Sequence, residues 1–199
     1  MTVSGVILAA GRSTRLGRPK QLLLLDGQPI IRITTRNAIN SRLGEVLVVV
    51  GAEAERVVSA IGELGQQIVV NSDFALGQST SLRAGLDAIS PDAEAVVFLL
   101  GDQPEVSPEV IDALISAFQD AGALIAQATY GGVPANPVLF ARVIFAELAD
   151  VTGDEGARSV MKRHAGEIAR VNVSDGPPPG DVDTDEDYVA LQARWRSIR

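Results

Sequence analysis

A glycine-containing segment after the first apolar run concentrates positive charge in an otherwise acidic chain. Its cations, all within nine residues, are Arg12, Arg15, Arg18 and Lys20. Gly11 and Gly17 allow close backbone approach and positive φ angles, and exposed N–H groups in such a loop can cradle phosphate oxygens. An anionic ligand would relieve the repulsion between the cations. The segment therefore indicates a phosphate site, with a solvated basic surface loop as the alternative; it is neither a Walker A motif nor a G-x-G-x-x-G fingerprint.

Carboxylates occur at two later positions where a metal could be needed. Asp102 follows the apolar run Ala95–Leu100 in a Gly-Asp-Gln-Pro turn, and Asp181 and Asp183 lie at the start of the last helical segment. Mg²⁺ prefers oxygen ligands and typically uses one or two carboxylates with phosphate oxygens and water. These residues are candidate metal ligands. An ordinary turn aspartate and acids favoured by a helix dipole are the alternatives.

Small hydroxyl residues open the third helical segment. Gly77, Ser79 and Ser81 lie there, and Asn71 ends the preceding apolar run. Such hydroxyls are usual helix caps, but they can also bind a base edge or a ribose.

Alternating strand-like and helix-like segments must position these groups. Nearly continuous apolar runs predict buried strands over Val3–Ala9, Glu45–Val50, Gln67–Val70 and Ala95–Leu100. Helical spacing predicts helices over Pro29–Asn40, Glu53–Ile61, Ser79–Ile89 and Ser107–Ala121, the last with Ser107 as N-cap and Pro108 at its first position. The last third adds strands over Ala123–Thr129 and Glu167–Val173 and helices over Arg142–Leu148, Glu155–His164 and Asp183–Arg196, with Thr184 as a candidate cap.

This order predicts an α/β fold: a Rossmann-like, open, mostly parallel sheet with helices on both faces. Ligands of such sheets bind at the carboxyl ends of the strands, where the loop and Asp102 fall. We expect one domain over 1–199, with a first part over about 1–105 that contains the loop and Asp102 and a second part over about 106–199.

Composition narrows the function classes. The 199 residues are 46% hydrophobic and carry a formal net charge of −8, which disfavours nucleic acid or an anionic membrane as a partner. Cysteine is absent, so thiolate chemistry is excluded. His164 is the sole histidine and is expected to be structural, which leaves covalent catalysis little support. Met1–Ala10 lacks the basic start of a secretory signal, and a cytoplasmic location is expected.

The motifs together resemble the MobA-like NTP transferase family, and within it the molybdenum cofactor cytidylyltransferase branch. Leu8–Lys20 matches the pattern L-A-[AG]-G-x-S-x-R-[ML]-G-x-x-K, and Gly77–Leu82 matches G-x-S-x-S-L. The Gly-Asp-Gln-Pro turn resembles the form found in that branch, Asp181–Thr184 resembles its Asp-Ile-Asp-Thr segment, and Gly153–Arg158 fits G-D-x-G-A-R.

The resemblance implies roles for individual residues. The first loop would hold the triphosphate, Lys20 would contact phosphate, and Arg15 would stabilise charge on the transferring group. Asp102 and Asp183 would bind Mg²⁺, Asp183 being the better second ligand by position. The implied nucleotide-binding set is Leu8, Ala9, Ala10, Gly11, Arg12, Lys20, Asn71, Gly77, Ser79 and Ser81. Ala10 favours CTP, because the guanylyl branch typically has glycine there.

The acceptor side resembles the family less closely. Asn136 and Pro137 lie in the counterpart of its Gly-[His/Asn]-Pro-Val segment, but Ala135 stands where glycine is usual and Pro134 replaces a more typical polar residue. Arg158 is the implied clamp for a phosphate or a pterin.

The implied reaction is Mg²⁺-dependent transfer of CMP from CTP to the phosphate of molybdopterin, with release of pyrophosphate and possible delivery to a recipient molybdoenzyme. Alternatives within the class are guanylyl transfer or nucleotidyl transfer to a sugar, polyol or phospholactate acceptor. A non-catalytic chaperone for the cofactor is the alternative outside it.

Overall fold

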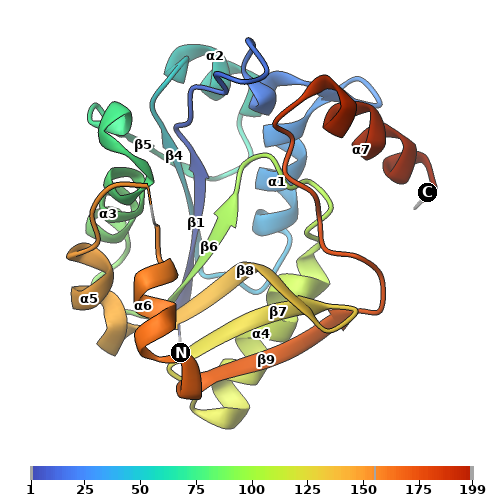
Figure 1. The fold of residues 1–199 in the computed structure, drawn as a ribbon. Helices are drawn as coiled ribbons and strands as arrows, with labels where there is room; N and C mark the ends of the chain where they lie inside the picture. The colour runs from blue at the N-terminus through green and yellow to red at the C-terminus, as the bar shows by residue number, and fades with distance from the viewer. Residues whose placement is uncertain (1, 155, 198–199) are drawn as a thin grey trace.

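A computed structural model describes residues 2–154 and 156–197. Over these residues the chain forms a seven-stranded sheet in the order β5-β4-β1-β6-β8-β7-β9, with a two-stranded hairpin beside it (Figure 1). The sheet strands are β1 (Thr2–Ala9), β4 (Glu45–Val50), β5 (Gln67–Val70), β6 (Ala93–Leu100), β7 (Ile125–Tyr130), β8 (Val133–Ala141) and β9 (Ile168–Ser174). The hairpin pairs β2 (Leu24–Leu25) with β3 (Gln28–Pro29). The predicted α/β fold with an open, mostly parallel sheet is confirmed.

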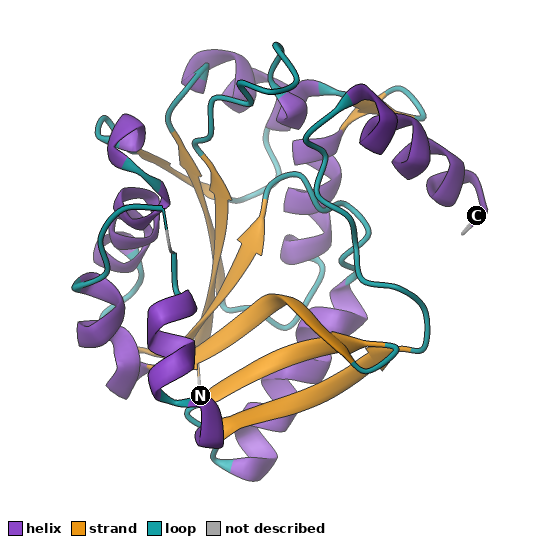
Figure 2. Cartoon of the chain, in the orientation of Figure 1, coloured by secondary structure: helices purple, strands orange, loops and turns teal. Residues whose placement is uncertain are grey.

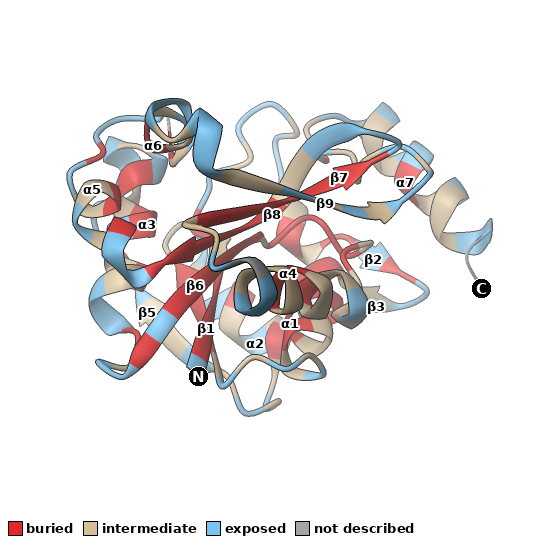
Figure 3. Ribbon diagram, turned by 90° about the horizontal axis from the view of Figure 1, so that it is seen from below, coloured by how far each residue is buried: buried red, intermediate tan, exposed pale blue. Residues whose placement is uncertain are grey.

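The first strands are parallel, and β1, β4 and β6 are largely buried. The edge strand β5 is not: the burial predicted from its apolar run is wrong, since Val70 is 69% exposed. β1 pairs with β4 and β6, and β4 pairs with β5, all in parallel. Every residue of Val46–Val50 is at most 3% exposed, as a continuous apolar run predicts. Figure 3 shows this buried layer at the centre of the molecule. Because the chain leaves β1 and β6 at the same edge, the loop after Ala9 and the turn after Leu100 meet there.

β8 is the strand of the seven-stranded sheet that the sequence did not predict, and the short hairpin strands β2 and β3 were not predicted either. β8 runs antiparallel to both β6 and β7, whereas β9 is again parallel to β7. Pro134 and Pro137 lie within it, and prolines are uncommon inside central strands. The register of the β7–β8 pair shifts between Gln127 and Thr129, which lets the strand accommodate the region around the prolines.

Helices cover both faces of the sheet (Figure 2). One face packs on α1 (Ile30–Ile39), α2 (Ala54–Ile61) and α4 (Pro108–Ala121). The other packs on α3 (Gln78–Ala88), α5 (Phe145–Ala149) and α6 (Arg158–Arg163). Short 3₁₀ helices lie at Lys20–Leu22, Phe74–Leu76, Arg142–Ile144 and Ala165–Glu167.

Most predicted helices agree with these bounds to within one or two residues. The one predicted over Glu155–His164 begins later, at Arg158, and Glu155 lies outside the described residues. Ser107 occupies the N-cap of α4 with Pro108 next to it, but its side chain makes no capping hydrogen bond. None of the helices in the described residues is long and apolar enough to cross a membrane.

The last helix returns to the beginning of the chain. Leu191 of α7 (Asp185–Ser197), together with Val182 just before that helix, packs in a cluster with Leu25 and Ile30 that is separate from the two sheet faces. Thr184 caps it as predicted: its Oγ1 accepts from Asp187 N at 3.2 Å, while Asp187 Oδ2 accepts from Thr184 N at 2.9 Å. This reciprocal cap fixes the segment that carries Asp183.

Candidate active site

The basic loop follows β1 and turns through two residues with positive φ. Ser13 has φ 50° and Gly17 has φ 68°, and Gly17 N donates to Ser13 O at 3.1 Å. The turn brings Lys20, which begins the first 3₁₀ helix, to the edge where β1 and β6 end. A Cβ added to Gly11 or Gly17 would meet no atom within 4 Å, so both glycines border open space.

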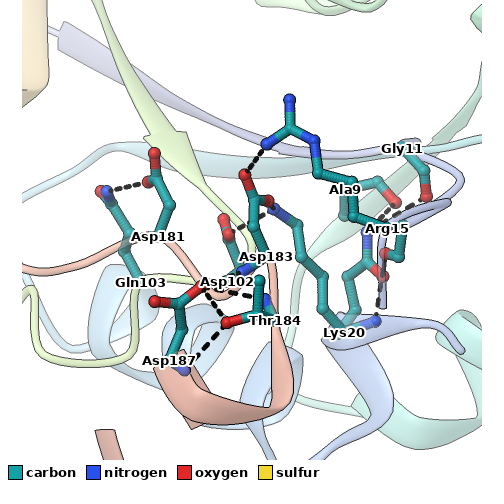
Figure 4. Close-up of polar contacts among 12 residues, drawn as sticks. Ala9, Gly11, Arg15, Lys20, Asp102, Gln103, Asp181, Asp183, Thr184 and Asp187 are labelled. Atoms are coloured by element: carbon teal, nitrogen blue, oxygen red, sulfur yellow. Dashed lines mark hydrogen bonds and ion pairs between the residues drawn. The ribbon is translucent and has the colours of Figure 1, made fainter. Parts of the chain in front are cut away.

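Lys20 forms ion pairs with both predicted metal ligands. Its Nζ lies 2.7 Å from Asp102 Oδ2 and 3.2 Å from Asp183 Oδ1 (Figure 4). The Asp102 side chain is only 7% exposed, whereas that of Asp183 is 39% exposed. Three segments that are far apart in the sequence therefore share one cation: the first loop, the turn after β6 and the segment before α7.

The charges at this point alter one another's protonation. Burial opposes the charge on Lys20, but Asp102 and then Asp183 outweigh it and raise the pKa of Lys20 above its usual value. Asp181 accepts a hydrogen bond from Gln103 Nε2 at 3.0 Å. Burial, and next the charge of Asp102, raise the pKa of Asp181 above its ordinary value. The ammonium of Lys20 thus stays charged, and Asp181 takes up a proton more readily than an ordinary aspartate does.

Two arginines of the loop pair with the acidic segment at the start of α7. Arg15 contacts Asp183 and Arg18 contacts Asp185, and Arg18 also lies 6.0 Å from the Tyr188 ring centroid. The Arg15 side chain is 76% exposed. Exposed pairs of this kind contribute little stability. An anionic ligand could therefore replace the carboxylate partner of either arginine with little loss of stability.

A cavity of about 600 Å³ opens beside Lys20 and Asp102. Its apolar lining comes from β1, β6, β8 and the α3 and α6 helices and consists of Leu8, Leu82, Phe98, Leu100, Val138, Phe140 and Met161. Its polar lining includes Arg12, Lys20, Gln78, Asp102, Asn136, Asp154, Arg158 and Asp181. An apolar lining with a few polar groups is typical of a small-molecule site.

The structure brings most of the predicted site residues to this cavity. Those that line it are Leu8, Ala10, Gly11, Arg12, Lys20, Gly77, Ser81, Asp102, Asn136 and Arg158. Arg15 and Asp183 pair beside it. Ala9, Asn71, Ser79 and Pro137 are not among the described residues that line it.

Two of those four are engaged elsewhere. Asn71 Nδ2 donates to the hydroxyls of Thr80 and Ser81 at 2.9 Å, and its Oδ1 accepts from Asp73 N at 2.9 Å. Ser79 is 2% exposed and its N–H donates to Gly153 O at 3.0 Å. In this arrangement Asn71 supports Ser81, which does line the cavity, and Ser79 lies beneath the loop that precedes α6.

Asp154, which belongs to the G-D-x-G-A-R motif, lines the cavity, and its Oδ1 accepts from Gln78 N at 3.1 Å at the amino end of α3. Sequence reasoning missed two other groups at the cavity. The Arg12 guanidinium lies over the Phe74 ring, with Arg12 Cζ 5.2 Å from the ring centroid. Gln21 is 3% exposed and lines the cavity. Of these two, only Gln21 carried a sequence signal, as a polar residue that opens the apolar run after Lys20.

The donor set suits a divalent cation. The described residues contain no group of three or more metal-ligating side chains, but Asp102 and Asp183 already share one positive charge at Lys20 Nζ. Two carboxylates completed by phosphate oxygens and water are the usual environment of Mg²⁺ in phosphoryl-transfer sites.

Comparison with known proteins gives concordant matches. A family model described as the MobA-like NTP transferase domain matches residues 5–168. The chain is 32% identical to the purine catabolism protein PucB of Bacillus subtilis, over 92% of this chain and 93% of that protein. It is also 32% identical to the nicotine blue oxidoreductase of Paenarthrobacter nicotinovorans, over 95% of this chain and 96% of that protein.

Solved structures agree with these matches. A homologue of Rv0371c from Mycobacterium sp. strain JC1 superposes with a TM-score of 0.89 at 33% identity, covering 99% of this chain and 98% of the other. Rv0371c of Mycobacterium tuberculosis in complex with manganese gives 0.84 at 32% identity, covering 97% and 99%.

Proposed function

Because the chain belongs to the MobA-like NTP transferase family and is a nucleotidyltransferase, we propose that it transfers CMP from CTP to the phosphate of a molybdopterin cofactor, in a Mg²⁺-dependent reaction that releases pyrophosphate. One observation carries the proposal. Lys20 Nζ lies between the carboxylates of Asp102 and Asp183, at 2.7 and 3.2 Å, beside a cavity of about 600 Å³.

Asp102 and Asp183 are the residues that would hold Mg²⁺. When bound, the ion would neutralise charge on the phosphates and orient them. Rv0371c, with 32% identity, is known in complex with manganese, which supports a divalent cation in this family. With the carboxylates so occupied, Lys20 would be available to the triphosphate.

The side chains at the site then have to overcome the repulsion between the acceptor phosphate and the triphosphate of CTP. The acceptor phosphate is already ionised at neutral pH, so no strong general base is needed. One of its oxygens forms a bond to the α-phosphorus of CTP, the bond from that phosphorus to the bridging oxygen breaks, and pyrophosphate leaves. Lys20, Arg12 and Arg15 would stabilise the triphosphate and the leaving group, since positioning and electrostatics carry most of such reactions.

The two substrates would bind to opposite sides of the cavity. We assign the nucleotide to the part over about 1–105, with Ala10 and Ser81 beside the base, and the acceptor to the part over about 106–199. Asn136, Pro137 and Arg158 are the acceptor residues of this proposal. The apolar side chains of Phe98, Val138 and Phe140, which line the cavity, would suit the flat ring system of a pterin.

The choice of base and acceptor is open to direct test. The chain is 37% identical over 123 residues to a 3-deoxy-manno-octulosonate cytidylyltransferase of Chlorobium luteolum, covering 61% of this chain and 47% of that protein. That match supports CTP. Guanylyl transfer, or a sugar, polyol or phospholactate acceptor, is the alternative in the same class, and the name of the Paenarthrobacter relative adds a redox reaction as a second candidate.

The test is a pyrophosphate-release assay of the full chain. Each of the four triphosphates is incubated with purified molybdenum cofactor, with and without Mg²⁺. We expect release with CTP that requires both cofactor and metal. Release with GTP alone would reassign the base, and tight cofactor binding without any release would favour a chaperone. Oxidation of a nicotinamide cofactor with a dye acceptor, and no release, would favour the redox candidate.

A further inference from the structure

The side chain of Gln21 is buried against the backbone of the basic loop, residues 11–20, which we call the phosphate loop. Gln21 is only 3% exposed although its side chain is polar. Its Nε2 donates to Ala9 O at 3.3 Å and to Gly11 O at 3.4 Å. A single carboxamide thus binds the two carbonyls that flank Ala10, at the point where β1 becomes the loop (Figure 4 labels Ala9 and Gly11).

The same carboxamide also reaches the far end of the loop. Ser13 Oγ donates to Gln21 Oε1 at 3.5 Å and accepts from Lys20 N at 3.1 Å. Ser13 has φ 50°, a conformation that a non-glycine residue adopts only at a cost. The two hydrogen bonds of its hydroxyl hold it there, so Gln21 connects the start of the loop, its turn and the backbone of Lys20.

These contacts set the direction of backbone N–H groups. In a trans peptide the carbonyl of one residue and the N–H of the next point in opposite directions. Gln21 therefore orients the N–H groups of Ala10 and Arg12, and both residues line the cavity. The carbonyl of Ala10, which lies between those of Ala9 and Gly11, accepts from Ala52 N at 3.1 Å. Three successive carbonyls of the loop thus each accept a hydrogen bond from a donor of the protein.

We propose that Gln21 is a positioning residue for the triphosphate: its carboxamide holds the peptide groups of the loop in the orientation that binds phosphate oxygens. The inference rests on the proposed function, since it takes the loop to be the triphosphate site. Its role depends on the side chain being a donor and an acceptor at once. Glutamate has the same shape without the donor, and methionine has a similar volume with neither group.

The variant Gln21→Met separates positioning from packing. It conserves the buried volume but removes the donor to Ala9 O and Gly11 O. We expect the Kd for CTP and the Kd for inorganic tripolyphosphate, measured by calorimetry with Mg²⁺, to rise by the same factor of about tenfold, the effect of losing hydrogen bonds of this kind. An equal factor for both ligands follows because the loop contacts phosphate and not the base.

Gln66→Met is the matched control. Gln66 binds a turn remote from the cavity in a similar way, donating to Gly62 O at 2.9 Å and accepting from Leu64 N at 3.1 Å. Its variant should leave both Kd values unchanged. Gln21→Glu is the second test variant, and at neutral pH its carboxylate should weaken both ligands as Gln21→Met does.

The outcomes distinguish the two claims. If the wild-type chain binds CTP and tripolyphosphate and folded Gln21→Met binds them equally well, the role of Gln21 is overturned and the triphosphate site stands. If the wild-type chain binds neither ligand, the site and the role of Gln21 both fall. If both Gln21 variants lose the circular dichroism of the folded chain, Gln21 serves stability rather than positioning.

Discussion

Arg194 donates two hydrogen bonds to Glu105, from Nε to Oε1 at 2.9 Å and from a terminal nitrogen to Oε2 at 3.0 Å. Arg194 lies on α7 and Glu105 lies three residues after Asp102. The pair therefore joins the element that follows Asp183 to the turn that carries Asp102. This ion pair is more buried than those that Arg15 and Arg18 form with Asp183 and Asp185, because the Glu105 side chain is only 10% exposed.

Removing Arg194 should weaken the fold measurably. Arg194→Met leaves the mostly buried Glu105 carboxylate without its main partner, and we expect the free energy of unfolding to fall by about 1–2 kcal/mol. Urea denaturation followed by circular dichroism measures the change. Arg196→Met, at an exposed position on the same helix, is the control. Equal midpoints for the two variants would show that the Arg194–Glu105 contact contributes nothing.

Asp102→Asn should abolish turnover while the fold survives. The substitution keeps the shape of the side chain but removes the charge that holds Lys20 and would bind the metal. We expect the rate of pyrophosphate release to fall by at least about a hundredfold, in line with the loss of a charged group at a phosphoryl-transfer site. Asp150→Asn, which removes an exposed carboxylate at the end of α5, should retain full activity. Near-normal turnover of Asp102→Asn would refute the metal assignment.

The His164 cluster should make stability depend on pH. His164 Nε2 lies 2.8 Å from Glu147 and Nδ1 lies 3.0 Å from Glu167, with Arg163 also on Glu147. Hydrogen bonds to Glu167 and then Glu147 raise the pKa of His164 above 6.5, and the hydrogen bond from His164 lowers the pKa of Glu147 below 4.5. The histidine contributes its full stabilisation below 6.5 and loses it as pH rises through its raised pKa. The glutamate contributes fully above 4.5 and loses its contribution as pH falls through its lowered pKa.

His164→Gln should therefore lower Tm most between these two values. The Tm difference from wild type should shrink on the alkaline side, once His164 is neutral in both states. Thermal melts of both proteins from about pH 4 to about pH 9 measure it. A Tm difference that stays constant across the range would mean that the histidine acts by packing and not by charge.

Gly85→Ala should destabilise the chain, although alanine favours helices. Gly85 lies inside α3, and a Cβ there would come within 2.5 Å of Val6 Cγ1. Overpacking of this kind costs about 1–3 kcal/mol, which outweighs the gain in helix propensity of about 1 kcal/mol. In a double-mutant cycle with Val6→Ala, the combined loss measured by urea denaturation should be smaller than the sum of the single losses. Additive losses would exclude the predicted clash.

The sequence predicted the parallel half of the sheet well because its signal is local. Val46–Val50, for example, is apolar throughout and rich in valine, and such a short β-branched run identifies a buried strand from local residues alone. β8 has no such signal, since Pro134, Asn136 and Pro137 interrupt it, and its pairing with β6 and β7 depends on residues far away in the chain.

The candidate site divides in the same way. Lys20 and Asp102 stand in motifs at the ends of strands, where the fold itself brings them together. The inward orientation of Asn71 and the contacts of Gln21 follow from hydrogen-bond partners that composition and spacing do not specify. Residues that act through the backbone of another segment leave almost no pattern along the chain.

The pairing of Lys20 with Asp183 also has a temporal consequence. These residues are 163 positions apart, so a ribosome releases the phosphate loop long before it has made the acid that completes the site. Closing so long a loop is slow compared with forming local contacts. The parallel strands β1, β4, β5 and β6 can consequently assemble while the polypeptide is still growing, and the contact of Lys20 with both carboxylates should form only in the final stage of folding, when α7 docks.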